Sequence, residues 1–370
     1  MGVKMEKIYF DNAASTKIRE EVLDYLVDCC RKYYANPSAV HDLGRQSRVM
    51  LEKARSKVAS LLNVKPQDIL FTSGATESNN LAIRGLISKS KKKEIITSSI
   101  EHSSILKLME QLEKEGYTVH YVKALSNGQI DIEDFARYLN KNTCLVSIMA
   151  VNNETGTRQP IDKISEILKD RDVYFHVDAA QLMGKQEIDP YFLGIDSLTG
   201  SAHKFYGPKG VGILYLKDDI EIQKQMYGGP QERNKRPGTE NLNAILATSY
   251  AMEIAYKNMK KENEYIKELS DYLISKLDKN YVINGENRIP SIINIQIKNK
   301  NIQTLVPLLD MKKIMISAGS ACMSGSISPS KVLLNMGLSE EEARSSIRVS
   351  LGIHNTKEEI DYFITCLEKL

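Results

Sequence analysis

The stretch CLVSIMAVNNETGTRQPIDKISEILKDRDVYFHVD, residues 144–178, decides the fold. It begins with the apolar run 144–151 and ends with a second β-rich run at 173–178. Between them, residues 161–169 repeat apolar side chains at the spacing of an amphipathic helix. Two buried strands joined by one helix form a βαβ unit, whose strands lie parallel in the same sheet. We therefore expect a parallel sheet covered by helices.

The same alternation continues on both sides of this unit. Five more β-rich runs are predicted as strands, at residues 68–72, 94–98, 118–122, 195–200 and 211–216. Helical patterns lie between several of them, at residues 76–88, 103–115 and 132–139. The sequence thus predicts an α/β fold with a mainly parallel seven-stranded sheet flanked by helices.

The pattern changes after Gly238. Residues 241–279 form one long helical stretch without Gly or Pro. A strand-like run, two short helical patterns and a final amphipathic helix follow, at residues 291–297, 303–309, 331–336 and from 357 onward. We predict a large domain over residues 15–255 and a smaller α+β domain made of residues 1–14 and 256–370.

The composition argues against several classes of protein. The 370 residues include 50 Lys plus Arg and 47 Asp plus Glu, which gives a net charge of +3. Both signs are interspersed, whereas a nucleic-acid-binding surface needs a dense basic face. The longest apolar run, 143–151, is far shorter than the roughly 20 residues of a membrane span. Because the first residues also lack a signal-peptide pattern, we expect a cytoplasmic protein that binds neither membranes nor nucleic acid.

The cysteines indicate a reducing compartment. The chain has five of them, Cys29, Cys30, Cys144, Cys322 and Cys366, and no CxxC pair. An odd number at wide spacing predicts neither a disulfide framework nor a metal site. Each is then either a small core residue or a reactive thiol.

The segment FTSGATESNNLAI, residues 71–83, passes from a predicted strand into a predicted helix. A helix start with Gly and small hydroxyl residues offers free backbone N–H groups and the positive end of a dipole, which suits a phosphate. An ordinary helix cap with Glu77 in the first turn explains the same residues, so this segment alone leaves both readings open.

Two further segments favour the phosphate interpretation. Lys204 lies in a glycine-rich turn of SLTGSAHKFYGPKGVGILYL, residues 197–216, where exclusion of water would lower its pKa and suit it to a Schiff base. Asp178 ends an apolar strand, where a carboxylate is costly unless a cation such as a protonated pyridine nitrogen faces it. A phosphate site, an aspartate and a lysine in this order are the parts that pyridoxal phosphate requires.

Eight motifs in order closely resemble those of the cysteine desulfurases of iron–sulfur cluster and nitrogenase assembly. They are TSGATESNN, TSSIEHSSIL, VNNETGTRQP, HVDAAQ, SAHKFYGPKGVG, GGPQERNKRPGTEN, SAGSACMSG and SSIRVSLG. The resemblance extends from about Tyr9 to the last helix. It implies a fold-type I pyridoxal phosphate enzyme, a homodimer, that converts L-cysteine to L-alanine and leaves a persulfide on one of its cysteines.

The resemblance also implies roles for individual residues. Lys204 would bind the cofactor covalently, Asp178 would pair with its ring nitrogen, and His102 would stack on the ring and move protons. The remaining cofactor contacts would be Ala75, Thr76, Ser201, His203 and the partner subunit's Thr239 for the phosphate, and Asn153 and Gln181 near the ring hydroxyl. Arg348 would hold the substrate carboxylate, because a guanidinium can make two parallel hydrogen bonds to it, and Asn36 would lie near the substrate.

Cys322 has surroundings unlike those of the other thiols. Residues 317–330, SAGSACMSGSISPS, are nearly all small or hydroxyl residues, whereas Cys144 lies in an apolar run. This composition is typical of an accessible loop, and in the family this position carries the nucleophile. We expect the Cys322 thiolate to attack the substrate sulfur, with His102 as the candidate proton acceptor.

Three alternatives remain at this stage. An aminotransferase shares the fold but needs no accessible thiol, and a selenocysteine lyase shares both the fold and the thiol. A sulfur carrier that has lost catalysis would not need Lys204, Asp178, His102 and Cys322 together. The sulfur acceptor, an iron–sulfur scaffold protein or a tRNA-thiolating enzyme, is not specified by the sequence. The chain ends at LEKL soon after its last helical pattern, whereas some members continue with a segment that helps dock the scaffold.

Overall fold

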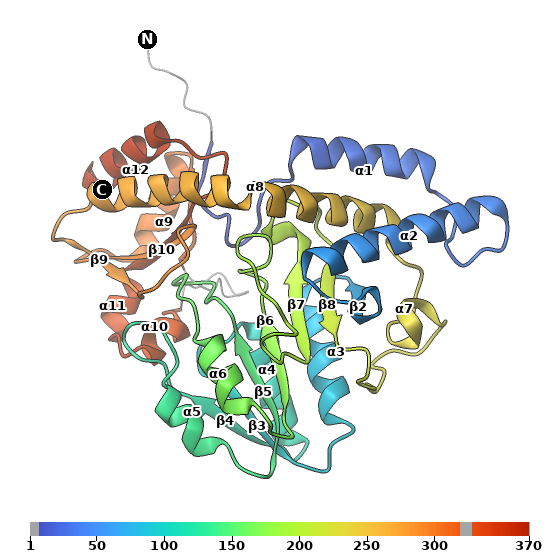
Figure 1. The fold of residues 1–370 in the computed structure, drawn as a ribbon. Helices are drawn as coiled ribbons and strands as arrows, with labels where there is room; N and C mark the ends of the chain where they lie inside the picture. Colours follow the sequence, from blue (N-terminus) through green and yellow to red (C-terminus); the bar gives the residue numbers. More distant parts are fainter. Residues whose placement is uncertain (1–6, 319–327, 370) are drawn as a thin grey trace.

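A seven-stranded sheet forms the centre of the computed structural model, which describes residues 7–318 and 328–369 (Figure 1). Its strands, in spatial order, are β2 (Ile69–Thr72), β8 (Gly212–Leu216), β7 (Ser197–Ser201), β6 (Tyr174–Asp178), β5 (Thr143–Met149), β3 (Glu94–Ser98) and β4 (Thr118–Val122). Six of these strands run in the same direction, and β8 alone runs in the opposite direction. The predicted mainly parallel seven-stranded sheet is confirmed.

Helices cover both faces of the sheet because its side chains alternate between two apolar layers. On β2, Ile69 and Phe71 face one layer and Leu70 faces the other. The first layer also contains residues of α2 (Asp42–Leu61), α5 (Ile132–Tyr138), α6 (Ile161–Leu168) and α8 (Leu242–Ser275). The second contains residues of α3 (Ala75–Ile87) and α4 (Ser103–Lys114).

A separate apolar core lies beside the sheet. It is built around the antiparallel strands β12 (Ser346–Ser350), β10 (Ile292–Ile297) and β9 (Tyr281–Asn284), and around a parallel pair of β1 (Ile8–Tyr9) and β11 (Ile314–Met315). Helices α9 (Ile302–Met311) and α12 (Lys357–Lys369) pack onto it. Phe10 meets Phe363 of α12 edge to face, so the N-terminal segment belongs to this core.

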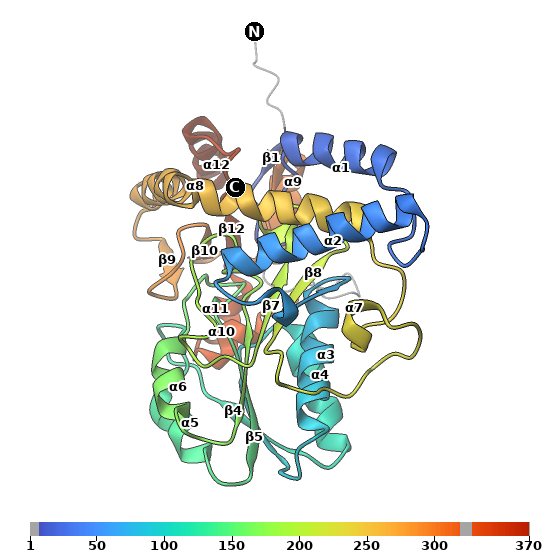
Figure 2. The same ribbon diagram turned by 45° about the vertical axis from the view of Figure 1, so that its right-hand side comes forward.

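One helix joins the two cores. The first part of α8 buries Leu242 and Met252 against the sheet, and its last part buries Ile266 and Leu273 in the second core. Its 34 residues span about 50 Å at 1.5 Å per residue, and Figures 1 and 2 show it crossing the molecule. The predicted domain boundary after residue 255 falls inside α8, and that division stays a prediction.

The remaining elements lie around these layers, and α1, α10 and α11 add buried side chains to the first one. They are α1 (Glu20–Lys32), the 3₁₀ turns η1 (Pro66–Asp68) and η2 (Ala202–Lys204), α7 (Gln231–Asn234), α10 (Lys331–Asn335) and α11 (Glu340–Arg344).

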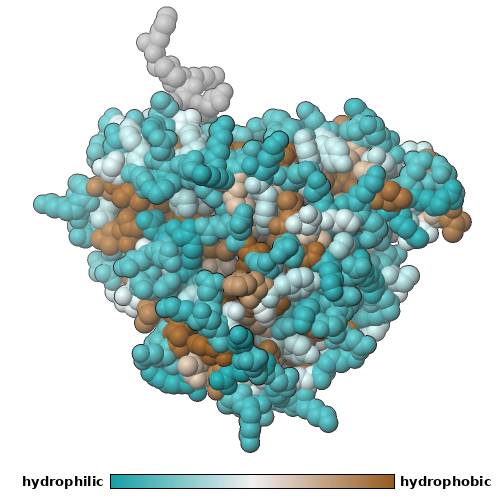
Figure 3. Space-filling view, viewed as in Figure 1, coloured by the Kyte–Doolittle hydropathy of each residue, from teal (hydrophilic) through white to brown (hydrophobic). Residues whose placement is uncertain are grey.

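Figure 3 shows mostly hydrophilic side chains on the face seen in Figure 1, with separate apolar patches. Within residues 7–318 and 328–369, no helix has the length and apolar character needed to cross a membrane.

Candidate active site

The predicted site residues gather at one edge of the sheet. Strands β2, β3, β5, β6 and β7 all run in the same direction, so their carboxyl ends meet at that edge. The residues at or just after these ends include Thr76, His102, Asn153, Asp178 and Ser201. Open α/β sheets bind their ligands at this edge.

Lys204 lies at the end of η2, directly after β7. Its Nζ donates to the backbone carbonyl oxygens of Ala13 at 2.6 Å and Ala14 at 2.9 Å. Burial is the main cause that lowers the pKa of Lys204 to about 8, and the nearby Arg348 guanidinium lowers it further. Asp178 and Asp11 act in the opposite direction. An amine with this pKa is partly unprotonated near neutral pH, as a nucleophilic lysine must be.

Asp178 is buried at the end of β6 and is held by two hydrogen bonds. Its Oδ2 accepts from Nδ2 of Asn79 at 2.8 Å, and its Oδ1 accepts from the Ala180 amide at 2.9 Å. From the sequence, this carboxylate is expected to face a cation, and the sequence does not identify its partner Asn79, a residue of α3. A polar residue on the buried face of α3, beside Ala82 and Ile83, was the available signal.

His102 follows β3 and forms the N-cap of α4. Its Nδ1 accepts from the Ser104 amide at 3.2 Å and lies 2.9 Å from the Ser104 hydroxyl. The same hydroxyl oxygen accepts from Nδ2 of Asn79 at 3.0 Å. His102 is exposed at the edge of the sheet, but desolvation by the protein atoms around its ring lowers its pKa below the usual value. Asp178 opposes this shift, and Lys204 adds to it.

The start of α3 offers free backbone N–H groups that can bind an anion. Its N-cap is Gly74, which has no side chain to bond the free N–H groups of the first turn. Thr72, Gly212 and Ser201 lie side by side on β2, β8 and β7. A Cβ at Gly212 would lie 2.6 Å from the Gly74 backbone, so only glycine permits this approach.

His203 lies just beyond Ser201. Its Nδ1 is buried and has no hydrogen-bond partner among the described residues. Burial lowers the pKa of His203 to about 4, helped by Lys204, so the ring is neutral and its Nδ1 is available to an oxygen or hydroxyl group. This arrangement fits a phosphate.

Arg348 enters the site from β12 of the second core. It is 5% exposed, and its Nη2 forms an ion pair with Oδ1 of Asp11 at 2.7 Å. Its Nη1 donates to the Asn153 carbonyl at 2.8 Å. Within the described part of the chain, the buried Nε has no acceptor. The guanidinium therefore keeps a donor for a carboxylate.

Comparisons with known proteins agree with this geometry. The family model Aminotransferase class-V matches residues 8–363. The chain is 41% identical to "Cysteine desulfurase IscS" of Dictyoglomus turgidum, with 98% of this chain and 94% of that protein covered. Among solved structures, a "NifS-like protein" superposes with a TM-score of 0.93 at 36% identity, covering 98% of this chain and 99% of the other. "SspA in complex with cysteine" gives 0.84 at 36% identity, covering 95% and 100%.

The chain belongs to the cysteine desulfurase family. This family uses pyridoxal phosphate. The neutral His203, whose Nδ1 has no partner among the described residues, and the uncapped start of α3 fit its phosphate, and the partly buried Lys204 fits its aldehyde. The buried Asp178 fits its ring nitrogen.

The N-terminal segment of this family member holds the site together, although the sequence argument gave it no role. The carbonyl of Ala13 accepts from both Lys204 and Nε2 of Gln181, the latter at 2.8 Å. Thr16 binds the His203 carbonyl at 2.9 Å through its hydroxyl. The available signal was the run of small residues after β1, where resemblance to the desulfurases begins.

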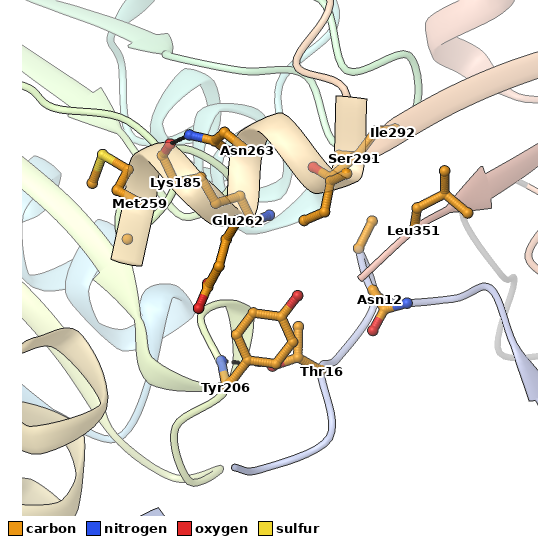
Figure 4. A pocket seen from close by; sticks show the side chains of 13 residues that line it. Asn12, Thr16, Lys185, Tyr206, Met259, Glu262, Asn263, Ser291, Ile292 and Leu351 are labelled. Atoms are coloured by element: carbon orange, nitrogen blue, oxygen red, sulfur yellow. Dashed lines mark hydrogen bonds between the residues drawn. The ribbon is translucent and has the colours of Figure 1, made fainter. Parts of the chain in front are cut away.

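Lys185 was also missed. It is partly buried, and its Nζ donates to Oε1 of Gln181 at 3.0 Å. Burial lowers the pKa of Lys185 to about 7, and Lys204 and Arg348 contribute. Figure 4 shows Lys185 beside Glu262 and Tyr206 at an enclosed cavity of about 20 Å³. Such a cavity holds about one water molecule.

Three predicted residues of this desulfurase-family chain are not brought into the group. Asn36 is exposed in the loop between α1 and α2, where its Oδ1 accepts from the Ser38 amide at 2.8 Å. Thr239 is exposed between α7 and α8. Cys322 lies outside the described residues.

The described residues on either side of this gap lie beside the site. Ser317 pairs with Arg348 through two backbone hydrogen bonds, of 2.8 and 3.3 Å. The Ser330 hydroxyl donates to Glu154, the neighbour of Asn153, at 2.5 Å.

Proposed function

We propose that the protein is a pyridoxal phosphate-dependent cysteine desulfurase that converts L-cysteine to L-alanine and stores the sulfur as a persulfide on Cys322. The observation that carries this proposal is the convergence of Lys204 and Arg348 on the segment from Asp11 to Ala14. A lysine of lowered pKa and an arginine with an unused donor lie there together, as binding of an amino acid beside the cofactor requires.

Pyridoxal phosphate, when bound, withdraws electron density from the α-carbon of an amino acid. Lys204 would hold its aldehyde carbon, and Asp178 would accept a hydrogen bond from its ring nitrogen. The first turn of α3, at Ala75 and Thr76, would bind the phosphate together with Ser201 and His203. Asn153 and Gln181 would lie near its ring hydroxyl.

Arg348 would orient the substrate. Its Nε–H has no partner among residues 7–318 and 328–369 and can bind one carboxylate oxygen, while Asp11 and Asn153 keep the guanidinium plane fixed. A fixed plane lowers the entropy cost of making two parallel hydrogen bonds. Asn36 would also contact the substrate.

Cys322 would take the sulfur. Its thiolate attacks the substrate sulfur, so an S–S bond forms and the carbon–sulfur bond breaks. The electron pair of the broken bond stays on the β-carbon, which takes up a proton and becomes the methyl group of alanine. Sulfur is oxidised to the persulfide level as carbon is reduced, so no external oxidant is needed.

We also propose a homodimer that works in the cytoplasm. The loop between α1 and α2 exposes Tyr34 and Val40, and the segment before α7 exposes Tyr227. Figures 1 and 2 place this loop and α7 at the same end of the molecule. Thr239 lies between α7 and α8, as a residue that reaches the partner's phosphate site would. The described cysteines are all free, which suits a reducing compartment.

The sulfur acceptor would be an iron–sulfur scaffold protein or a tRNA-thiolating enzyme. Transfer of ³⁵S from the persulfidated protein to each purified acceptor would distinguish the two.

The test is an assay of alanine and sulfide from L-cysteine, under a thiol reductant, with the cofactor-loaded protein. We expect equal amounts of both products, and no persulfide in Cys322→Ala. Cys30→Ala, which removes an exposed thiol on α1, is the matched control and should keep full activity. Turnover of selenocysteine alone would support a selenocysteine lyase instead, and a protein that cannot bind the cofactor would contradict both.

A further inference from the structure

The two ring nitrogens of His102 have different surroundings. Nδ1 faces two donors, the backbone N–H of Ser104 and the Ser104 hydroxyl, at 3.2 and 2.9 Å. The backbone N–H cannot reverse its role, so Nδ1 must be an acceptor. A neutral imidazole that accepts at Nδ1 carries its proton on Nε2.

The direction of the Ser104 hydroxyl is fixed by its other neighbour. Asn79 donates from Nδ2 to the Ser104 oxygen at 3.0 Å and to Oδ2 of Asp178 at 2.8 Å. Its Oδ1 lies 3.1 Å from Nε2 of the buried His176. Because both Asn79 hydrogens are used in this way, the single Ser104 hydroxyl proton points to His102.

Protonation of His102 would disrupt this arrangement. The second proton would have to enter at Nδ1, where it would face the Ser104 N–H. The cap of α4 would then be lost and its amide left unbonded. The positive end of the α4 dipole opposes the same charge.

We propose that His102 is held as a neutral Nε2–H hydrogen-bond donor by the start of α4 and by Asn79 through Ser104, and that it does not accept the proton during the reaction. This proposal rests on the proposed function, and it makes Ser104 and Asn79 positioning residues. It replaces the expectation that His102 takes the proton from Cys322. Lys204 remains as the nearby amine that can accept one.

The charged groups around the ring are consistent with this assignment. Asp178, from β6, favours a charged imidazole, whereas Lys204, from η2, opposes it. Desolvation by the surrounding protein atoms outweighs both, and the pKa of His102 is lowered from the ordinary 6.5.

The test is ¹H–¹⁵N NMR of protein with ¹⁵N-labelled histidines, recorded against pH before and after loading with pyridoxal phosphate. Two-bond correlations separate protonated from unprotonated ring nitrogens. His102→Asn assigns the signal and keeps a side chain that can cap α4. We expect the neutral Nε2–H form in both samples at the pH of maximal activity, and a pKa of His102 below 6.5.

Two serine variants test the positioning role. Ser104→Ala removes one of the two donors to Nδ1 and should raise the pKa of His102, whereas Ser103→Ala, in the same turn of α4, should leave it unchanged. Asn79→Asp should also raise this pKa, because it adds a negative charge and loses the donors to Ser104 and Asp178.

An Nδ1–H form, or a cationic His102 at the pH of maximal activity, would overturn the proposal. The spectra of the cofactor-free protein need no turnover, so failure of the desulfurase assay would leave this result intact. Conversely, an active enzyme whose His102 is cationic or in the Nδ1–H form at the pH of maximal activity would refute only the proposed state of His102.

Discussion

Arg348 of β12 and Asp11 of the N-terminal segment form a partly buried ion pair, with 2.7 Å between Nη2 and Oδ1. The pair fixes the guanidinium, while its Nε has no acceptor in the part of the chain that the structure describes. Arg348→Lys keeps the charge but loses the planar fork. We expect KM for L-cysteine to rise about 10- to 100-fold, the value of one charge-assisted hydrogen bond. Steady-state kinetics measures this. Arg344→Lys, at an exposed i, i+4 pair with Glu340, is the control and should behave as wild type. An unchanged KM in Arg348→Lys would exclude the carboxylate role.

Lys204→Ala removes the amine that contacts the Ala13 and Ala14 carbonyls. We expect alanine formation to fall to background and the bound cofactor to be lost on dialysis, because only non-covalent contacts remain. Visible absorbance after dialysis measures the second effect. Lys209→Ala changes an exposed lysine nearby and should retain both properties. Retention of activity by Lys204→Ala would place the reactive amine elsewhere.

Glu101, next to His102, predicts a pH-dependent stability. Burial raises its pKa to about 8, while hydrogen bonds from Ser98 and the Met149 amide lower it and Asp178 raises it. A raised carboxyl pKa stabilises the fold below the unfolded value of 4.5, and this contribution is lost as the pH rises from 4.5 to about 8.

The free energy of unfolding of Glu101→Gln should therefore increase relative to that of wild type as the pH rises across this interval. We expect the difference in free energy of unfolding to change by roughly 3 kcal/mol between pH 4.5 and pH 7. Urea denaturation of the cofactor-free protein at several pH values measures it. Glu110→Gln, on the exposed side of α4, is the matched control. A difference that does not vary with pH would show that Glu101 is ionised in the fold.

Val40 tests the homodimer. It is 88% exposed in the loop between α1 and α2, so Val40→Asp costs the isolated subunit little. We expect the variant to sediment as a monomer at low concentration, with reduced activity. Phe192→Asp alters a residue that is 85% exposed in the segment between β6 and β7 and should stay dimeric. A wild-type protein that sediments as an active monomer would contradict the dimer.

The sequence predicted the sheet well because its strands are buried runs with clear ends. The runs at 94–98 and 118–122 coincide with β3 and β4, and the others differ by one or two residues. Arg348 is buried together with its apolar neighbours in the sequence, Ile347, Val349 and Leu351. Both features depend only on residues within a single strand, so a short stretch of sequence is enough to indicate them.

Other parts of the site could not be predicted because they depend on contacts between distant segments. The Ala13 carbonyl meets Lys204 across 191 residues of sequence, and Asn79 meets Asp178 across 99. Every residue has a backbone carbonyl oxygen, so the sequence does not show which one contacts a lysine. A single Asn in a helical pattern does not by itself indicate a buried partner for a carboxylate on another strand. The roles of all the predicted site residues stay predictions, and Cys322, Asn36 and Thr239 are also not placed with the others.

The continuous helix α8 couples the two cores mechanically. Bending it between Met252 and Ile266 would break backbone hydrogen bonds in a segment without glycine or proline. Lys204 and Arg348, one from each core, are therefore placed relative to one another by a helix that resists bending.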